Sequence, residues 1–270
     1  MDVPLILTSP HSGNYYPEFY KDNLLTPLNL CHSIEDMYVN EFIEDFAQDI
    51  DVYLSKYSRA VIDLNRNIFE LDRDLICDEI NFDTFKTLKV KSGIGLIPTQ
   101  TLEGKITFKN KFTYQQFKFL KEDVYHKWHN LLNESINKKL SMFDRVFIID
   151  FHSMPSQNND SCLSDFILGN INGLSCRESE IDFISNEIKK FGYTVDLNNP
   201  YSGGYITKNY YDKTRNVETL QIEINKKLYM NEMDFSKTTN FELVKGNIKE
   251  IIKNFIQHMK SDIGINIAAE

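Results

Sequence analysis

Short apolar runs alternate along this chain with longer amphipathic segments, and this alternation is the feature that most constrains its fold. A short apolar run is typical of a buried strand, while apolar residues spaced three or four apart are typical of a helix that buries one face. Strands that alternate with helices favour a layered α/β architecture. Since the chain has 270 residues and we find no internal repeat or linker-like tract, we expect one domain over residues 1–270.

The two patterns place the expected elements along the chain. The apolar runs predict strands over residues 5–8, 51–54, 60–64, 146–151, 166–168, 194–196 and 219–224. The amphipathic segments predict helices over residues 33–48, 114–143, 179–191 and 241–259. Residues 70–107 are expected to be irregular, and long loops of this kind often cover a site. The sequence leaves open whether this loop covers one.

Composition narrows the class of protein. The net charge of −9 and the pI near 5.2 disfavour a general nucleic-acid binder, because such a chain repels phosphate backbones. The four cysteines are widely spaced and form no C-x-x-C pair, which indicates a reducing compartment. No apolar run approaches the roughly 20 residues that span a bilayer. We therefore expect a cytoplasmic protein whose partner is neither a nucleic acid nor a membrane.

Polar residues recur where the expected strands end. His11 follows the first strand, residues 63–66 read D-L-N-R at the end of the third, and His152 follows the fourth. Glu223 lies in the last strand. Because ligands of open α/β sheets bind outside the carboxyl ends of the strands, these side chains predict a site at one edge of the sheet.

The two histidines point to a metal site. Two imidazoles and one carboxylate, with a position left for water, form a ligand set of catalytic zinc. Glu35 and Asp36 offer the carboxylate, but on the predicted helix they lie about 100° apart, so only one of them faces the site. Asp150 is a candidate to orient an imidazole through its second ring nitrogen. The alternative is that each histidine is an ordinary hydrogen-bonded loop residue.

Several blocks of sequence also carry a resemblance to a known family. The segments SPHSGNYYP, SRAVIDLNR, DFHSMP, GGYIT and LQIEINKKLYMNE occur in this order, and with them the chain resembles the N-formylglutamate amidohydrolases from about residue 5 to residue 232. That family is similar to the zinc carboxypeptidases and aspartoacylase. The resemblance implies a three-layer α/β/α domain with a mixed central sheet, of the phosphorylase/hydrolase-like (zinc carboxypeptidase-like) class.

The resemblance also implies a ligand set and a base. One Zn²⁺ ion, or another divalent metal, would be held by His11, Asp36 and His152, which favours Asp36 over Glu35. Glu223 matches the strand glutamate that acts as general base towards water and then as general acid towards the leaving amine.

The implied substrate contacts come from two further blocks. Arg59 would polarise the scissile carbonyl, while Asn65 and Arg66 would hold the carboxylate of the substrate, which a guanidinium can bind through two hydrogen bonds. Asp63 would orient an arginine rather than contact the substrate. The remaining positions match the substrate loop of the family: Gly203, Gly204 and Tyr205.

The expected function is that of a zinc-dependent amidohydrolase whose substrate is a small N-acyl amino acid, a carboxylate. The first candidate substrate is N-formyl-L-glutamate, which the enzyme would cleave to formate and glutamate. Asn170, Ile171 and Lys208 stand where the family usually has other residues. Two alternatives therefore stay open: a metal-dependent deacylase or peptidase of another small N-acyl amino acid or peptide, and a non-catalytic binding protein on the same scaffold. The oligomeric state is not predicted.

Overall fold

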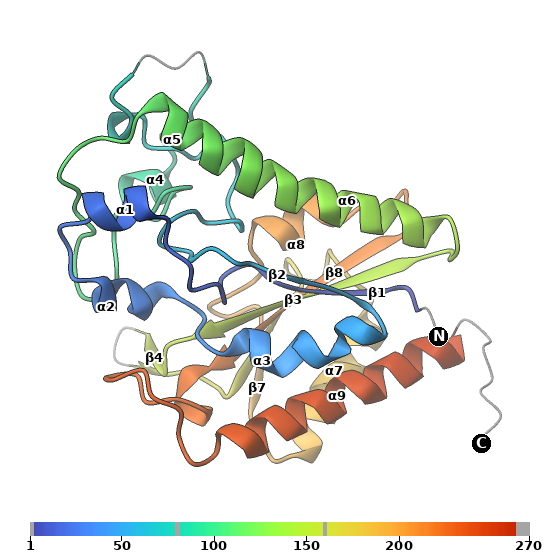
Figure 1. The fold of residues 1–270 in the computed structure, drawn as a ribbon. Helices are drawn as coiled ribbons and strands as arrows, with labels where there is room; N and C mark the ends of the chain where they lie inside the picture. The colour runs from blue at the N-terminus through green and yellow to red at the C-terminus, as the bar shows by residue number, and fades with distance from the viewer. Residues whose placement is uncertain (1–2, 79–81, 159–160, 263–270) are drawn as a thin grey trace. The chain divides into compact units, whose positions relative to one another are not determined.

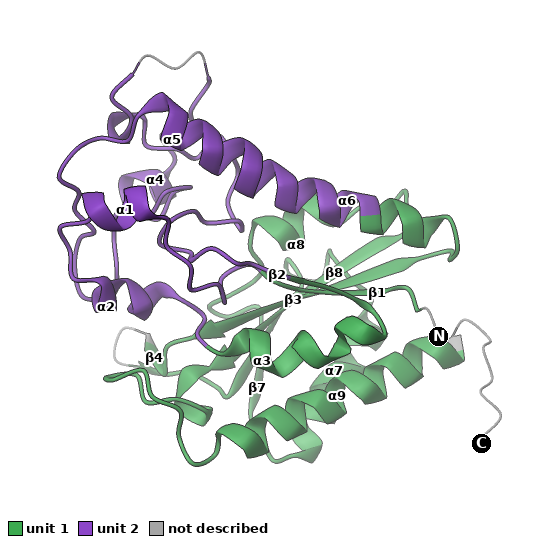
Figure 2. Cartoon of the chain, in the orientation of Figure 1, with its two compact units in different colours: residues 1–9, 38–53, 135–270 green, residues 10–37, 54–134 purple. Residues whose placement is uncertain are grey.

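The computed structural model describes residues 3–78, 82–158 and 161–262. The chain divides into two compact units: residues 1–9, 38–53 and 135–270 form unit 1, and residues 10–37 and 54–134 form unit 2 (Figure 2). The single domain expected over residues 1–270 stays a prediction.

Unit 1 contains a mixed sheet, whose strand order is β2-β1-β3-β8-β6-β7. Strand β3 is parallel to both β1 and β8, whereas β6 runs antiparallel to β8. The strands are β1 (Leu5–Ser9), β2 (Asp51–Leu54), β3 (Val146–Met154), β6 (Phe166–Gly169), β7 (Val195–Leu197) and β8 (Val217–Asn225), with a separate two-stranded ladder of β4 (Gln157–Asn158) and β5 (Ser161–Cys162).

Helices pack on both faces of this sheet (Figure 1). Ile149 and Ile222 face the apolar side chains of α7 (Glu178–Lys190) and α9 (Phe241–Asp262), and α3 (Val39–Ile43) lies against α9. Helix α8 (Tyr205–Tyr210) lies on the opposite face, where the Thr219 hydroxyl of β8 donates to the carbonyl of Thr207. The predicted α/β class with three layers and a mixed sheet is confirmed.

Unit 2 consists of short helices, one long helical segment and loops packed around aromatic side chains. Tyr20 lies edge-on to Phe108, with 5.4 Å between the ring centroids, and Phe108 is 4.8 Å from Phe112. Its helical elements are α1 (Glu18–Asn23), α2 (Leu28–Cys31), η1 (His32–Ile34), η3 (Arg73–Leu75), α4 (Leu88–Lys91), α5 (Tyr114–Phe119) and the π-helical η4 (Leu120–His126), which continues into α6 (Lys127–Leu140), whose end belongs to unit 1.

Two sequence predictions are wrong. Residues 60–64 form a buried turn instead of a strand, because the backbone N–H groups of Val61 and Ile62 both donate to the carbonyl of Ser58. Residues 33–48 are not one helix: η1 ends at Ile34, Glu35 is extended, Tyr38 has a left-handed φ of 67°, and only then do α3 and η2 (Glu44–Gln48) follow.

The remaining elements lie close to their predicted positions. Strand β3 continues to Met154, so His152 lies inside the strand instead of after it. Residues 70–107 are irregular apart from η3 and α4, although residues 79–81 lie outside the described part. Among the residues that the structure describes, no helix has both the length and the apolar character needed to cross a membrane.

Candidate active site

The register of the central strands brings several polar side chains to one face of the sheet. Thr8 of β1 is paired with Asp150 of β3, and His152 of β3 is paired with Glu223 of β8. Paired residues of neighbouring strands point to the same face, and alternate residues share it. Since Ile149 and Ile222 face helices α7 and α9, Asp150, His152 and Glu223 point to the opposite face.

A carboxylate holds the imidazole of His152. Nε2 of His152 lies 2.8 Å from Oδ2 of Asp150, whose other oxygen accepts a hydrogen bond from the Thr8 hydroxyl at 2.6 Å. An ionised carboxylate only accepts, so a neutral His152 ring carries its proton on Nε2 and its acceptor lone pair on Nδ1. Asp150 orients His152 as the sequence predicts, and Thr8 in turn orients Asp150.

His11 has the same arrangement in unit 2. Its Nε2 lies 2.7 Å from Oδ1 of Asp63, and its Nδ1 lies 3.4 Å from Oδ2 of Asp36. The backbone N–H of Asp36 also donates to the carbonyl of His11 at 3.1 Å. A carboxylate behind the ring again leaves the acceptor lone pair on Nδ1, and this atom faces the carboxylate of Asp36.

Asp63 connects His11 with the arginines. Its Oδ2 accepts a hydrogen bond from Nε of Arg59 at 3.0 Å and lies 3.7 Å from Nε of Arg66, while the backbone N–H of Asn65 donates to Oδ1. Burial alone would raise the pKa of Asp63, but His11, Arg59 and Arg66 outweigh it and hold the pKa of this carboxyl well below its usual value. Asp63 is therefore an acceptor at neutral pH. It orients an arginine as expected, and it also orients His11.

Glu35 has different partners from Asp36. The hydroxyl groups of Tyr16 and Ser58 both donate to its Oε1, and Nδ1 of His32 lies 2.8 Å from its Oε2. The hydrogen bond with Glu35 raises the pKa of His32, and burial together with the charge of Glu35 raises the pKa of Tyr16. The two neighbouring carboxylates thus serve separate networks, and Asp36 is the one beside His11.

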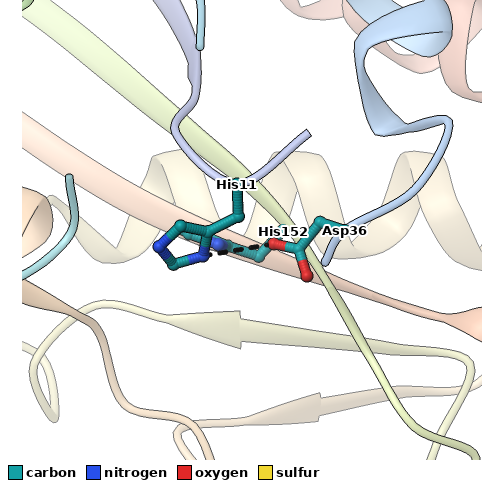
Figure 3. A group of neighbouring side chains, drawn as sticks. All are labelled: His11, Asp36 and His152. Carbon is teal, nitrogen blue, oxygen red and sulfur yellow. Dashed lines mark ion pairs between the residues drawn. The ribbon is translucent and has the colours of Figure 1, made fainter. Parts of the chain in front are cut away.

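The two histidines and Asp36 form a group that could hold a metal ion. Each of the three side chains is buried and offers one ligand atom, and these atoms lie within 4.8 Å of one another (Figure 3). Two imidazoles and a carboxylate form a donor set that suits zinc and related divalent ions.

The side chain of Gln221 joins Glu223 to the loop that contains Gly203 and Gly204, here called the glycine loop. Nε2 of Gln221 donates to Oε1 of Glu223 at 2.8 Å, and Oε1 of Gln221 accepts from the backbone N–H of Gly204 at 2.7 Å. Gly204 precedes α8, whose first residue is the half-buried Tyr205. Gly203 has a positive φ of 127°, and a Cβ there would lie 2.4 Å from Cδ1 of Ile171.

The predicted substrate arginines differ in their surroundings. Arg59 is 23% exposed at its side chain, and its Nη1 lies 3.5 Å from the carbonyl of Ile34. Arg66 is more buried, and its Nε and Nη1 donate to the carbonyls of Ile94 and Asn65 at 2.8 and 3.0 Å. Part of the Arg66 guanidinium is therefore used to connect its own turn with the segment around Ile94.

Sequence reasoning missed three contacts at this site. Thr8 and Gln221 carry a readable signal, because strand alternation places them on the same face as Asp150 and Glu223. Asp63 carries no such signal for a contact with His11, since residues 60–64 form a turn that the apolar pattern hides.

The comparisons with known proteins agree on one family. A family model of N-formylglutamate amidohydrolases matches residues 3–230. The N-formylglutamate deformylase of Pseudomonas putida is 28% identical over 240 residues, which cover 86% of this chain and 84% of that protein. The N-formylglutamate deformylase of Pseudomonas aeruginosa is 24% identical over 267 residues, 94% of this chain and 93% of that protein.

A solved structure supports the fold. The crystal structure of an N-formylglutamate amidohydrolase from Ralstonia eutropha matches with a TM-score of 0.89 and 24% identity, over 97% of this chain and 95% of that chain. At this identity the match bears on the α/β fold alone.

Proposed function

Because the chain belongs to the N-formylglutamate amidohydrolase family, whose members are hydrolases that act on an amide, we propose that it hydrolyses N-formyl-L-glutamate to formate and glutamate. The observation that carries this proposal is the group His11, Asp36 and His152, whose ligand atoms lie within 4.8 Å of one another. The names of the two Pseudomonas relatives support the choice of substrate.

His11, Asp36 and His152 would hold one divalent cation, Zn²⁺ in the first place. Such an ion would polarise the amide carbonyl and lower the pKa of a water molecule towards about 7. Asp63 and Asp150 support this role, because each fixes the ring orientation and the tautomer of one histidine. The threonine hydroxyl on Asp150 then limits the movement of that carboxylate.

Glu223 would act as general base and afterwards as general acid. Its place opposite His152 in the paired strands supports this role, since both side chains point to the same face. The base takes a proton from the attacking water, a bond forms between the water oxygen and the formyl carbon, and the C–N bond breaks. Glu223 then gives the proton to the departing amine nitrogen of glutamate.

Arg59 would stabilise the negative charge that develops on the amide oxygen, and Asn65 with Arg66 would bind the substrate carboxylate. The contacts of Arg66 limit how it does so. Its Nε and one N–H of Nη1 donate to backbone carbonyls, so the carboxylate would bind to the N–H groups of Nη2 and to the second N–H of Nη1. The loop of Gly203, Gly204 and Tyr205 would contribute backbone groups and a hydroxyl.

Metal analysis and assays on two variants test the proposal. We expect the purified protein to contain about one zinc per chain and to cleave N-formyl-L-glutamate. Glu223→Gln should keep the metal while kcat falls by at least about a hundredfold, whereas His11→Ala should lose metal and activity together. A Glu223→Gln protein that is both metal-loaded and active contradicts the mechanism. A protein that neither contains nor gains stability from zinc favours a non-catalytic binding role.

A second candidate function follows from Ile171. This β-branched residue has a left-handed φ of 54°, and its Cδ1 takes the space that a side chain at Gly203 would need. An apolar group beside the predicted substrate loop favours an N-acyl amino acid with a less polar side chain than glutamate. Assays on N-formyl-L-glutamate, N-formyl-L-leucine and N-acetyl-L-glutamate separate the two functions by the ratio of kcat/KM.

A further inference from the structure

Gln221 lies between two parts of the candidate site that are distant in sequence. It is 4% exposed, and both ends of its amide are used: Nε2 donates to Glu223 and Oε1 accepts from the N–H of Gly204. The orientation of the amide is fixed by these partners, because a carboxylate only accepts and a backbone N–H only donates. An apolar side chain of similar size would fill the space but form neither bond.

The sheet brings the glycine loop down to Gln221. Gly169 of β6 is the register partner of Gln221, and a Cβ at Gly169 would lie 2.8 Å from the carbonyl carbon of Ser202 and 2.9 Å from the nitrogen of Gly203. The backbone of residues 201–204 therefore packs directly on the sheet at this glycine. Gln221 lies on the adjacent strand β8, and its Oε1 accepts a hydrogen bond from the backbone N–H of Gly204, just before α8 (Figure 1 shows β8 and α8).

We infer that Gln221 is a positioning residue that holds the carboxylate of Glu223 and the backbone of Gly204 in one fixed relation. This inference rests on the proposed role of Glu223 as base. A hydrogen bond to one carboxylate oxygen restricts the rotation of the group and so aims the other oxygen. Catalytic groups need this support because they must be held to within about 0.5 Å of the productive geometry.

The hydrogen bonds have separable consequences for the enzyme. Loss of the bond to Glu223 misorients the base and lowers kcat, whereas loss of the bond to Gly204 loosens the substrate loop and raises KM. If Gln221 served in packing alone, its replacement would lower the stability of the fold without these separate effects on kcat and KM. Thr219 provides the comparison, because it lies on the same face of β8 and bonds helix α8 through the carbonyl of Thr207.

The experiment compares Gln221→Met, Gln221→Glu and Thr219→Val in the full chain. Gln221→Met removes both bonds, so we expect kcat on N-formyl-L-glutamate to fall by about tenfold to a hundredfold and KM to rise. Gln221→Glu keeps an acceptor for Gly204 but places a second carboxylate beside Glu223, so KM should return towards the wild-type value while kcat stays low. Thr219→Val should lose stability without either kinetic change.

A measurement that needs no turnover separates this inference from the proposed function. Amide hydrogen exchange of a peptide covering residues 201–206 should be faster in Gln221→Met than in the wild type, and should be restored in Gln221→Glu. The inference is overturned if exchange and kinetics in Gln221→Met match those of Thr219→Val. If the wild type does not cleave N-formyl-L-glutamate, the proposed function fails, and the exchange result alone then supports or overturns the positioning role.

Discussion

At the scale of single residues, Asp63 shows how a buried charge is kept in the fold. A carboxylate that is 1% exposed costs several kcal/mol unless donors replace the lost water. Asp63 has an imidazole, a backbone N–H and the Nε of Arg59 as donors, with Arg66 close by. These donors compensate for the hydration that the buried carboxylate loses. Through the same hydrogen bonds, Asp63 orients His11, a candidate metal ligand, and Arg59. We therefore expect that even a conservative replacement of Asp63 disturbs the site.

The substitution Asp63→Asn tests this dependence. An asparagine keeps the shape but offers one acceptor oxygen and an NH₂ donor, so it cannot serve both His11 and Arg59. We expect the affinity for zinc to fall by about 10- to 100-fold, measured by competition with a chromogenic chelator. Asp74→Asn, at an exposed position of η3, is the control and should leave the affinity unchanged. Equal zinc affinity in the two variants would contradict the role of Asp63.

Gly13 illustrates a different residue-scale constraint. A Cβ at Gly13 would lie 2.3 Å from the carbonyl oxygen of Tyr57 and 2.7 Å from that of Ser55, so the backbone after His11 packs directly on the neighbouring backbone. We expect Gly13→Ala to lower the free energy of unfolding by about 1–3 kcal/mol. Gly246→Ala is the matched control in helix α9, where a Cβ meets no atom within 4 Å.

The control substitution should raise the free energy of unfolding by about 0.5–1 kcal/mol, because alanine restricts the unfolded chain and favours the helix. Urea unfolding of both variants checks the pair. The close packing after His11 is disproved if the two alanines change stability in the same direction.

At the scale of elements, the sequence pattern predicts the sheet well and the connecting segments poorly. Strand β1 and the first half of β3 follow from continuous apolar runs, since burial on both faces leaves a strong signal, whereas β8 follows from the alternation of apolar and polar residues. The same signal misleads at residues 60–64, because a buried turn is as apolar as a buried strand. The helix predicted over 33–48 fails because the N–H of Asp36 donates to the carbonyl of His11, a contact between distant segments that no local pattern encodes.

Helix α6 carries a pH dependence that belongs to this scale. Burial lowers the pKa of His129 to about 4, despite its contact with the carbonyl of Leu64. In the unfolded chain the pKa is near 6.5, so below that pH the unfolded state binds a proton that the native state excludes. The stability of the native state therefore has its full value above about pH 6.5, where His129 is neutral in both states, and falls as the pH is lowered towards 4.

The substitution His129→Gln should therefore flatten the acid limb of the stability curve. Between pH 7 and pH 5 the wild type should lose about 2 kcal/mol more than the variant, measured by urea unfolding at each pH. Tyr125→Phe is the control, since it removes the hydrogen bond from the same helical segment to the carbonyl of Arg66 but no group that titrates in this range. Parallel curves for wild type and His129→Gln would refute the assignment.

At the scale of the whole molecule, the candidate site depends on segments that are far apart in the chain. The sequence could point to His11, Asp36 and His152 because strand ends and family blocks mark them. It also pointed to Asp150 as a side chain that orients an imidazole, but not to Thr8 or to the contact of Asp63 with His11, because those contacts depend on register and on a turn. A metal bound by such a set links the segments around residues 11, 36 and 152, so metal binding and folding must be thermodynamically coupled.

This coupling predicts a change in global stability. An ion that binds the native state alone raises the free energy of unfolding by about 2.7 kcal/mol when its concentration is a hundred times Kd. We expect chelation to lower the Tm of the full chain and zinc to restore it. In His152→Ala the gain with zinc should disappear, because one of the three ligand atoms is lost, whereas His126→Ala should keep it. If His152→Ala gains as much stability from zinc as the wild type does, the ion binds elsewhere and the proposed ligand set is wrong.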